Sequence, residues 1–133
     1  MVSRKDLVRT NPWVWEIPRT YRADMRVPAR AYLSEPLLDS ALEDGAMDQL
    51  VNTATLPGIV EHALAMPDMH QGYGFPIGGV VATALPDGVI SPGGVGYDIN
   101  CGVRLLRTGI EAEALAPHMD RLMTALYQNV SSG

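Results

Sequence analysis

The sequence predicts an α+β fold in which mixed strands and glycine-rich loops pack against helices. Apolar residues recur at helical spacing from Glu35 to about Leu56 and again after Thr108. Between His62 and Arg107, short apolar runs are instead separated by glycine and proline, which is typical of strands and their connections. A chain of 133 residues is long enough to form one domain with a real core.

The N-terminal half divides into an extended part and a helical part. Residues 1–30 alternate loosely and contain three prolines, so we expect edge strands and extended loop there. Ser34 is a suitable N-cap for the helical segment that follows, and Gly45 is expected to break that segment into two helices. Pro57 and Gly58 end it. We interpret this helical segment as scaffold.

Three strands are predicted in the middle of the chain, and a helix after them. The predicted strands are Ala63–Met66, Val80–Leu85 and Val103–Arg107, with a turn at residues 86–88 after the second. Thr108 and Glu111 then have the spacing of a capping box. The helical pattern is interrupted at Pro117, so its firm part is predicted from there to about Gln128. Its apolar face consists of Leu115, Met119, Leu122, Met123 and Leu126.

Charge is distributed unevenly along the chain. The net charge of −5 gives no global reason to expect nucleic-acid binding, but residues 1–30 hold seven cations and three anions. That segment carries +4 and the remainder −9. Trp13, Trp15 and Tyr21 lie among these cations and could stack on bases beside a phosphate backbone. The alternative is a solvated strand pair whose aromatic residues are anchored in the core.

The sequence predicts a soluble, cytoplasmic protein. It has neither a long uninterrupted apolar stretch nor the apolar region of a secretory signal. Its single cysteine, Cys101, cannot form an internal disulfide, and a reducing compartment suits it as a buried small residue, a metal ligand or a nucleophile.

The candidate chemistry lies in two glycine-rich loops. Nine of the thirteen glycines fall between Gly72 and Gly102, and glycine permits tight turns and close approach of a ligand to the backbone. The second loop holds Asp98 and Cys101 three positions apart, a spacing that lets a carboxylate and a thiolate converge on one cation. Neither loop has a nucleotide-binding GxxxxGK[ST] motif or a GxGxxG motif that opens onto a helix.

The first loop adds Asp68 at the exit of an apolar strand, followed by His70. His70 is interpreted either as a ligand or base, or as a residue that hydrogen-bonds a loop carbonyl. His62 and His118 are interpreted as structural or solvated. Because a metal site usually needs three or four protein ligands, we expect the site to take ligands from outside these loops.

Two motifs carry a family resemblance. Residues 66–79 (MPDMHQGYGFPIGG) and 91–104 (SPGGVGYDINCGVR) resemble RtcB-type tRNA-splicing ligases, and the similarity extends from about Trp15 to Asn129. The resemblance implies the N-terminal part of the RtcB fold. It also implies an enzyme that uses GTP and manganese to join RNA 3′-phosphate or 2′,3′-cyclic phosphate ends to 5′-hydroxyl ends, through a guanylated histidine.

The resemblance also implies roles for three residues. Asp98 corresponds to a metal ligand, and Cys101 corresponds to a thiolate that bridges two manganese ions. Asp68 corresponds to a catalytic acidic position near that centre. From ligand chemistry alone, a thiolate with imidazoles would favour zinc, so the choice of manganese depends on the resemblance.

Members of this family are several times longer than the chain. We therefore expect residues 1–133 to be a single N-terminal segment of an RtcB-like catalytic domain. The metal-binding histidines, the guanylated histidine and the nucleotide pocket are then expected beyond Gly133, and this chain alone is expected to be inactive. The implied partners are RNA, as tRNA halves or broken RNA, and an archease-like activator.

Two other interpretations stay open. A metal-dependent phosphoesterase with an Asp/Cys site would hydrolyse phosphoesters without GTP. A catalytically incomplete folding or regulatory fragment would expose apolar surface and is expected to self-associate.

Overall fold

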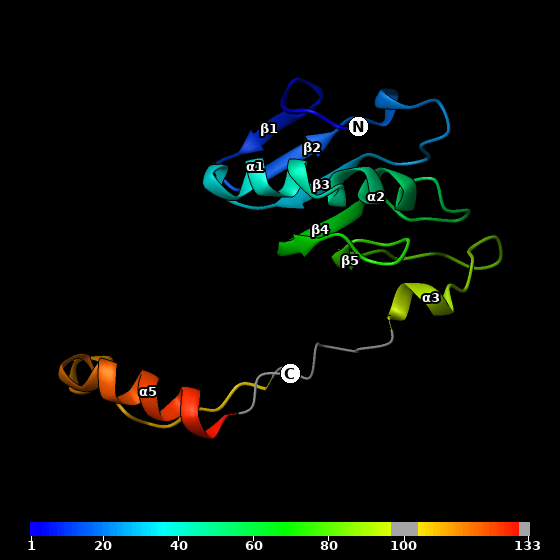
Figure 1. Ribbon diagram of the computed structural model, residues 1–133. Helices are drawn as coiled ribbons and strands as arrows, with labels where there is room; N and C mark the ends of the chain where they lie inside the picture. Colours follow the sequence, from blue (N-terminus) through cyan, green and yellow to red (C-terminus); the bar gives the residue numbers. More distant parts are fainter. Residues whose placement is uncertain (97–103, 131–133) are drawn as a thin grey trace. The chain divides into compact units, whose positions relative to one another are not determined.

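The computed structural model describes residues 1–96 and 104–130, and the chain divides into two compact units (Figure 1). The first unit, residues 1–99, contains a five-stranded mixed sheet with helices packed on it. The second unit, residues 100–133, contains helices in its described part. The predicted α+β class is therefore confirmed.

The sheet follows the order of the chain. Its strands are β1 (Val8–Asn11), β2 (Val14–Ile17), β3 (Ala29–Tyr32), β4 (Ala63–His70) and β5 (Ile77–Val80). Strands β3 and β4 run parallel, and the other neighbouring pairs are antiparallel. Two 3₁₀ turns, Arg4–Asp6 and Arg19–Tyr21, also lie in the N-terminal segment. The prediction of strands and loop in this segment is confirmed, but the prediction that they are edge strands is correct only for β1, because β2 and β3 are interior strands of the sheet.

Two helices connect the parallel strands. A parallel pair requires a crossover connection, and α1 (Glu35–Glu43) and α2 (Ala46–Thr53) supply it by packing against β4. Gly45 separates the two helices with φ = 84°, a left-handed conformation that suits glycine, so the predicted break is confirmed. Ser34 occupies the N-cap position of α1 but makes no side-chain capping hydrogen bond.

One face of the sheet forms the core. The register aligns Trp15 with Ala31 and Ala65, and Ile17 with Ala29 and Ala63. The small alanines allow the apolar sides of the two helices to approach the strands closely. The buried helix residues are Leu38, Ala41, Ala46, Met47, Leu50 and Val51.

Trp15 anchors the N-terminal strands in this core. Its side chain is 6% exposed, and the guanidinium carbons of Arg4 and Arg9 lie 5.8 Å and 5.2 Å from its ring centroid. These distances are within the range of cation–π contacts. Trp13 is 65% exposed. The interpretation of aromatic anchoring therefore holds for Trp15, whereas Trp13 remains on the surface.

Of the three strands predicted in the middle of the chain, one is confirmed and two are wrong. Ala63–Met66 is confirmed within the longer β4, but the strand predicted at Val80–Leu85 lies earlier, at Ile77–Val80. The chain after β5 pairs instead with the loop at residues 57–60: the Val60 amide donates to the Ala82 carbonyl at 2.9 Å. The described residues of the strand predicted at 103–107 have no regular secondary structure, and Leu105 is 97% exposed.

The second unit contains the predicted C-terminal helix. Its elements are α4 (Ala112–Leu115), a 3₁₀ turn (Ala116–His118) and α5 (Met119–Asn129), so the interruption at Pro117 is confirmed. The capping box is not formed, because α4 begins only after Glu111 and the Thr108 hydroxyl accepts the Ile110 amide at 3.2 Å instead. Among the described residues, no helix is both long and apolar enough to span a membrane.

Substitution of Gly58 tests how closely the loop at residues 57–60 packs on residues 87–88. Its φ is +68°, and an added Cβ would overlap the backbone of Gly88. We expect Gly58→Ala to lower the free energy of unfolding by about 2–4 kcal/mol, because left-handed strain and overpacking add. Urea denaturation followed by tryptophan fluorescence measures this change.

Gly93→Ala is the matched control, because a Cβ there would meet no heavy atom of residues 1–96 or 104–130 within 4 Å. It should change stability by less than about 0.5 kcal/mol. Equal losses in the two variants would contradict the close-packing argument.

Candidate functional site

The structure describes one of the two predicted functional loops in full. Asp68 and His70 lie on β4, and the loop that follows them leads into β5. Asp98 and Cys101, the predicted metal ligands, lie outside the described residues. The described part of the site therefore comprises the first loop and the start of the second, residues 91–96.

An irregularity in the sheet presents Asp68 and His70. Ala65 pairs with Gly79 and His70 pairs with Ile77, so β4 uses five steps of chain where β5 uses two. Such a bulge bends the strand and redirects its side chains. Met69 is buried, while Asp68 and His70 are exposed. The alternation of side chains along β4 thus buries Met69 and leaves the two titratable side chains exposed, at the irregular end of the strand.

Gly78 makes room for the Asp68 carboxylate. Gly78 has φ = +76°, and an added Cβ would lie 3.0 Å from Asp68 Oδ1. A larger residue at this position would be strained and would press on the carboxylate. Sequence reasoning did not single out Gly78, because it is one glycine among many in the motif.

The tautomer of His70 is fixed by its backbone partner. His70 Nδ1 lies 2.9 Å from the Asp68 carbonyl oxygen. Because a carbonyl oxygen only accepts, Nδ1 carries the hydrogen and the neutral ring keeps a lone pair on Nε2. The hydrogen bond to a loop carbonyl, one of the two interpretations of this residue, is therefore present. It leaves Nε2 available to accept a proton or to bind a metal ion.

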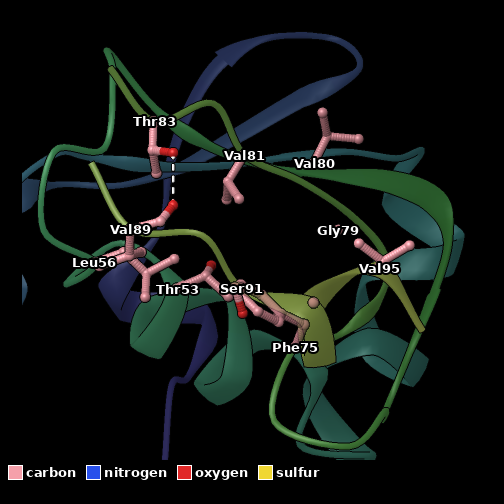
Figure 2. A pocket seen from close by; sticks show the side chains of 11 residues that line it. Thr53, Leu56, Phe75, Gly79, Val80, Val81, Thr83, Val89, Ser91 and Val95 are labelled. Atoms are coloured by element: carbon pink, nitrogen blue, oxygen red, sulfur yellow. Dashed lines mark hydrogen bonds between the residues drawn. The ribbon is translucent and has the colours of Figure 1, made fainter. Parts of the chain in front are cut away.

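The start of the second loop packs on the first. It forms the short helix α3 (Pro92–Val95), and an added Cβ at Gly94 would overlap the ring of Phe75. Beside this contact lies a pocket of about 330 Å³ (Figure 2). Its lining is mostly apolar, and the Thr83 hydroxyl donates to the Val89 carbonyl at 2.9 Å. The residues that line it carry no charged side chain, so it does not resemble a phosphate site.

The basic N-terminal segment is largely engaged within the fold. Arg4, Arg9, Arg22 and Arg30 each form an ion pair with a carboxylate, at distances from 2.6 Å to 3.3 Å. Hydrogen bonds to Glu35 and Asp39 raise the pKa of Arg4, and the Glu16 carboxylate raises the pKa of Arg30. The local excess of positive charge is thus partly neutralised by acidic residues that are near in space.

Within residues 1–96 and 104–130, no group of three or more His, Cys, Asp or Glu side chains is arranged to hold a metal ion. Within the first unit, His62 does not join Asp68 and His70 in such a group. The described part of the site therefore consists of an outward carboxylate, an imidazole of fixed tautomer and two packed loops.

Comparisons with known proteins identify the family. The family model described as "tRNA-splicing ligase RtcB" matches residues 49–133. A protein named tRNA-splicing ligase RtcB from Thermococcus kodakarensis is 51% identical over 119 residues, which cover 90% of this chain and 24% of that protein. The protein of the same name from Archaeoglobus fulgidus is 49% identical over 127 residues, covering 96% of this chain and 26% of that protein.

A third relative with this name, from Aeropyrum pernix, is 50% identical over 127 residues, covering 94% of this chain and 26% of that protein. The chain thus spans about a quarter of the length of the curated relatives it matches. The matched segment contains both glycine-rich motifs as well as Asp98 and Cys101. The chain therefore belongs to the RtcB family of tRNA-splicing ligases.

Proposed function

We propose that this chain is part of a GTP- and manganese-dependent RNA ligase and contributes Asp98 and Cys101 to its metal site. The family match over residues 49–133 carries the proposal, because it includes both residues. The relatives are named tRNA-splicing ligases, which supports RNA as the substrate. The proposed reaction joins a 3′-phosphate or 2′,3′-cyclic phosphate end to a 5′-hydroxyl end.

The donor chemistry of the chain fits a divalent metal ion. Asp98 offers a hard carboxylate, and Cys101 offers a thiol that a neighbouring cation keeps deprotonated. When bound, manganese would neutralise phosphate charge and act as a Lewis acid. Two protein ligands are too few for a catalytic site, so we propose that histidines outside this chain complete it. The GTP site and the guanylated histidine are proposed to lie outside the chain as well.

We assign Asp68 a catalytic role beside this centre. Its carboxylate is exposed and lies against Gly78, which supports a group that faces substrate rather than core. The neighbouring His70 offers Nε2 as the nitrogen that could accept a proton, because Nδ1 is occupied by the Asp68 carbonyl. Both side chains come from the same bulged end of β4, so a change in that bulge would move them together.

Ligation can be tested in a completed enzyme, defined here as the Archaeoglobus fulgidus relative with its 127 matching residues replaced by those of this chain. We expect it to join RNA ends with GTP and manganese. Cys101→Ala should lower the joining rate at least about 100-fold and weaken manganese binding, because a thiolate ligand is lost. A gel assay of RNA joining and calorimetric titration with manganese measure the two effects.

Thr124→Ala is the control, since the Thr124 hydroxyl bonds the Asp120 carbonyl within α5. It should leave joining unchanged. Removal of the RNA terminal phosphate without GTP, in place of joining, would support the phosphoesterase interpretation. Full joining activity in the Cys101→Ala variant would overturn the assignment of this residue.

The basic N-terminal segment is proposed to steer RNA phosphates. Arg22 pairs with Asp24 and Arg26 donates to the Thr55 carbonyl at 3.0 Å, and a guanidinium has five N–H donors in total. Each of these side chains therefore retains N–H groups that can donate hydrogen bonds to a phosphate oxygen. Arginine also binds phosphate oxygens in a bidentate manner, which favours it over lysine for this task.

Charge reversal tests this proposal. In the completed enzyme, the double variant Arg22→Glu and Arg26→Glu should weaken RNA binding, with a slope of log affinity against log salt that is shallower by about 0.7 for each lost contact to single-stranded RNA. Fluorescence anisotropy at several salt concentrations measures both quantities. Arg121→Glu, outside the basic segment, is the control. An unchanged affinity and slope in the double variant would exclude steering by these two arginines.

We also propose that the isolated chain self-associates through the apolar side of α5. Met119, Met123 and Leu126 follow one another at helical spacing and are exposed within the described residues. The double variant Met123→Lys and Leu126→Lys should therefore shift the chain toward monomer, as measured by light scattering on dilution. The control, Gln128→Lys, should not. A wild-type chain that is monomeric at all concentrations would contradict the proposal.

A further inference from the structure

We propose that Gln49 and Asp44 are positioning residues that fix the loop after β4 and, through it, the orientation of Asp68 and His70. The catalytic meaning of this inference rests on the function proposed above. The contacts themselves belong to the structure of the first unit and can be tested without any enzymatic assay.

The side chain of Gln49 forms hydrogen bonds with both backbone polar groups of Gly72. The Gly72 amide donates to Gln49 Oε1 at 2.9 Å, and Gln49 Nε2 donates to the Gly72 carbonyl at 2.7 Å. The Gln49 carboxamide thus pairs with the N–H and the C=O of one residue, as a residue on a neighbouring antiparallel strand would. Both contacts are satisfied in one orientation of the carboxamide, because its oxygen must face the N–H and its nitrogen the carbonyl.

Gly72 has no space for a side chain at this point. An added Cβ would overlap the Phe75 carbonyl oxygen, since the loop curls back on itself between β4 and β5. Gly72 lies between β4 and β5, outside the sheet ladder, so its backbone N–H and C=O need another partner. Gln49, reaching from α2, supplies that partner.

Asp44 forms a second anchor beside the first. Its Oδ2 accepts the Gln71 amide at 3.0 Å, and its Oδ1 accepts the Ala46 amide at the start of α2 at 2.9 Å. Two consecutive residues of the loop, Gln71 and Gly72, are thus tied to the junction of α1 and α2. His70 immediately precedes them, so the direction in which the chain leaves β4 is set by these anchors.

The anchors lie apart from the packing that holds α2 on the sheet. That packing comes from Met47, Leu50 and Val51, which are almost fully buried, whereas Gln49 and Asp44 are only partly buried. Beyond the anchors, Tyr73 is 89% exposed. A pair of hydrogen bonds at one end of an exposed loop contributes little to global stability and much to local orientation.

Gln49→Glu and Asn52→Asp form a matched pair of variants. Both add one negative charge to α2 by changing an amide to an acid, but Asn52 contacts Arg22 and not the loop. In Gln49→Glu, a carboxylate oxygen would face the Gly72 carbonyl. We expect amide hydrogen exchange at Gly72 to become about tenfold faster, with exchange at Leu50 changed less than about twofold.

The side chain of His70 gives a second readout. In the 133-residue chain, its ring ¹⁵N shifts should report the Nδ1–H tautomer, and Gln49→Glu should shift them toward a mixture of tautomers. In Gln49→Glu, protection of the Gly72 amide from hydrogen exchange should return as the pH falls through the pKa of the introduced carboxyl group. A protonated carboxylic acid offers one donor and one acceptor to Gly72, as the glutamine side chain does. If Gln49→Glu is unfolded, Asp44→Asn serves the same measurements.

The completed enzyme supplies the functional readout. Gln49→Glu should lower its RNA-joining rate about 10- to 100-fold, as expected for a displaced catalytic group, while Gln128→Glu, the same change at an exposed residue of α5, stays within twofold of the wild-type rate. Faster exchange at Gly72 with unchanged His70 shifts and unchanged joining would overturn the inference. Failure of the unmutated completed enzyme to join RNA would instead count against the proposed function. The exchange and ¹⁵N measurements would still decide whether Gln49 fixes the loop after β4 and the His70 ring.

Discussion

The parallel pairing of β3 with β4 is the constraint on which the rest of the first unit depends. It requires a crossover, which α1 and α2 form, and it aligns the alanines on which those helices rest. The same helices then supply Asp44 and Gln49 to the loop that leaves β4. One connection therefore builds the core and also holds the segment that bears Asp68 and His70. A scaffold of this kind places exposed functional groups on a rigid base, as catalysis requires.

The loops combine two uses of glycine that are physically distinct. At Gly74 and Gly78 the backbone has a positive φ, so the absence of Cβ relieves strain. At Gly72 and Gly94 the limiting factor is space, since neighbouring atoms occupy the position of a side chain. Turns and close packing therefore explain the glycines at these positions. It does not require a phosphate-binding loop in this part of the chain.

Much of the fold could be predicted because its signals are local. Helical spacing and Gly45 predict the two helices, and the apolar run that begins at Ala63 predicts β4. The position of β5 could not be predicted, because the residues after Val80 pair with the distant loop at 57–60. The contact between Gln49 and Gly72 spans 23 residues and gives no local pattern, and a glutamine on a helix looks like ordinary surface. For Asp98 and Cys101, the carboxylate and thiolate donors and the family resemblance predict metal binding. Their spacing in the sequence does not give the distance between the two side chains.

The long connection between β3 and β4 also has a consequence for how the chain folds. Residues 12–13 join β1 to β2 and residues 18–28 join β2 to β3, whereas β4 pairs with β3 only after the crossover at residues 33–62 has been spanned. Closing a longer loop costs more chain entropy, and non-local pairing slows folding. The N-terminal meander therefore has the lower entropic cost of closure, and we expect β4, which carries Asp68 and His70, to pair after it. Once paired, β4 is held between β3 and β5 and covered by α1 and α2, so local opening is expected to begin at the exposed edge strand β1 and to leave the functional strand in place.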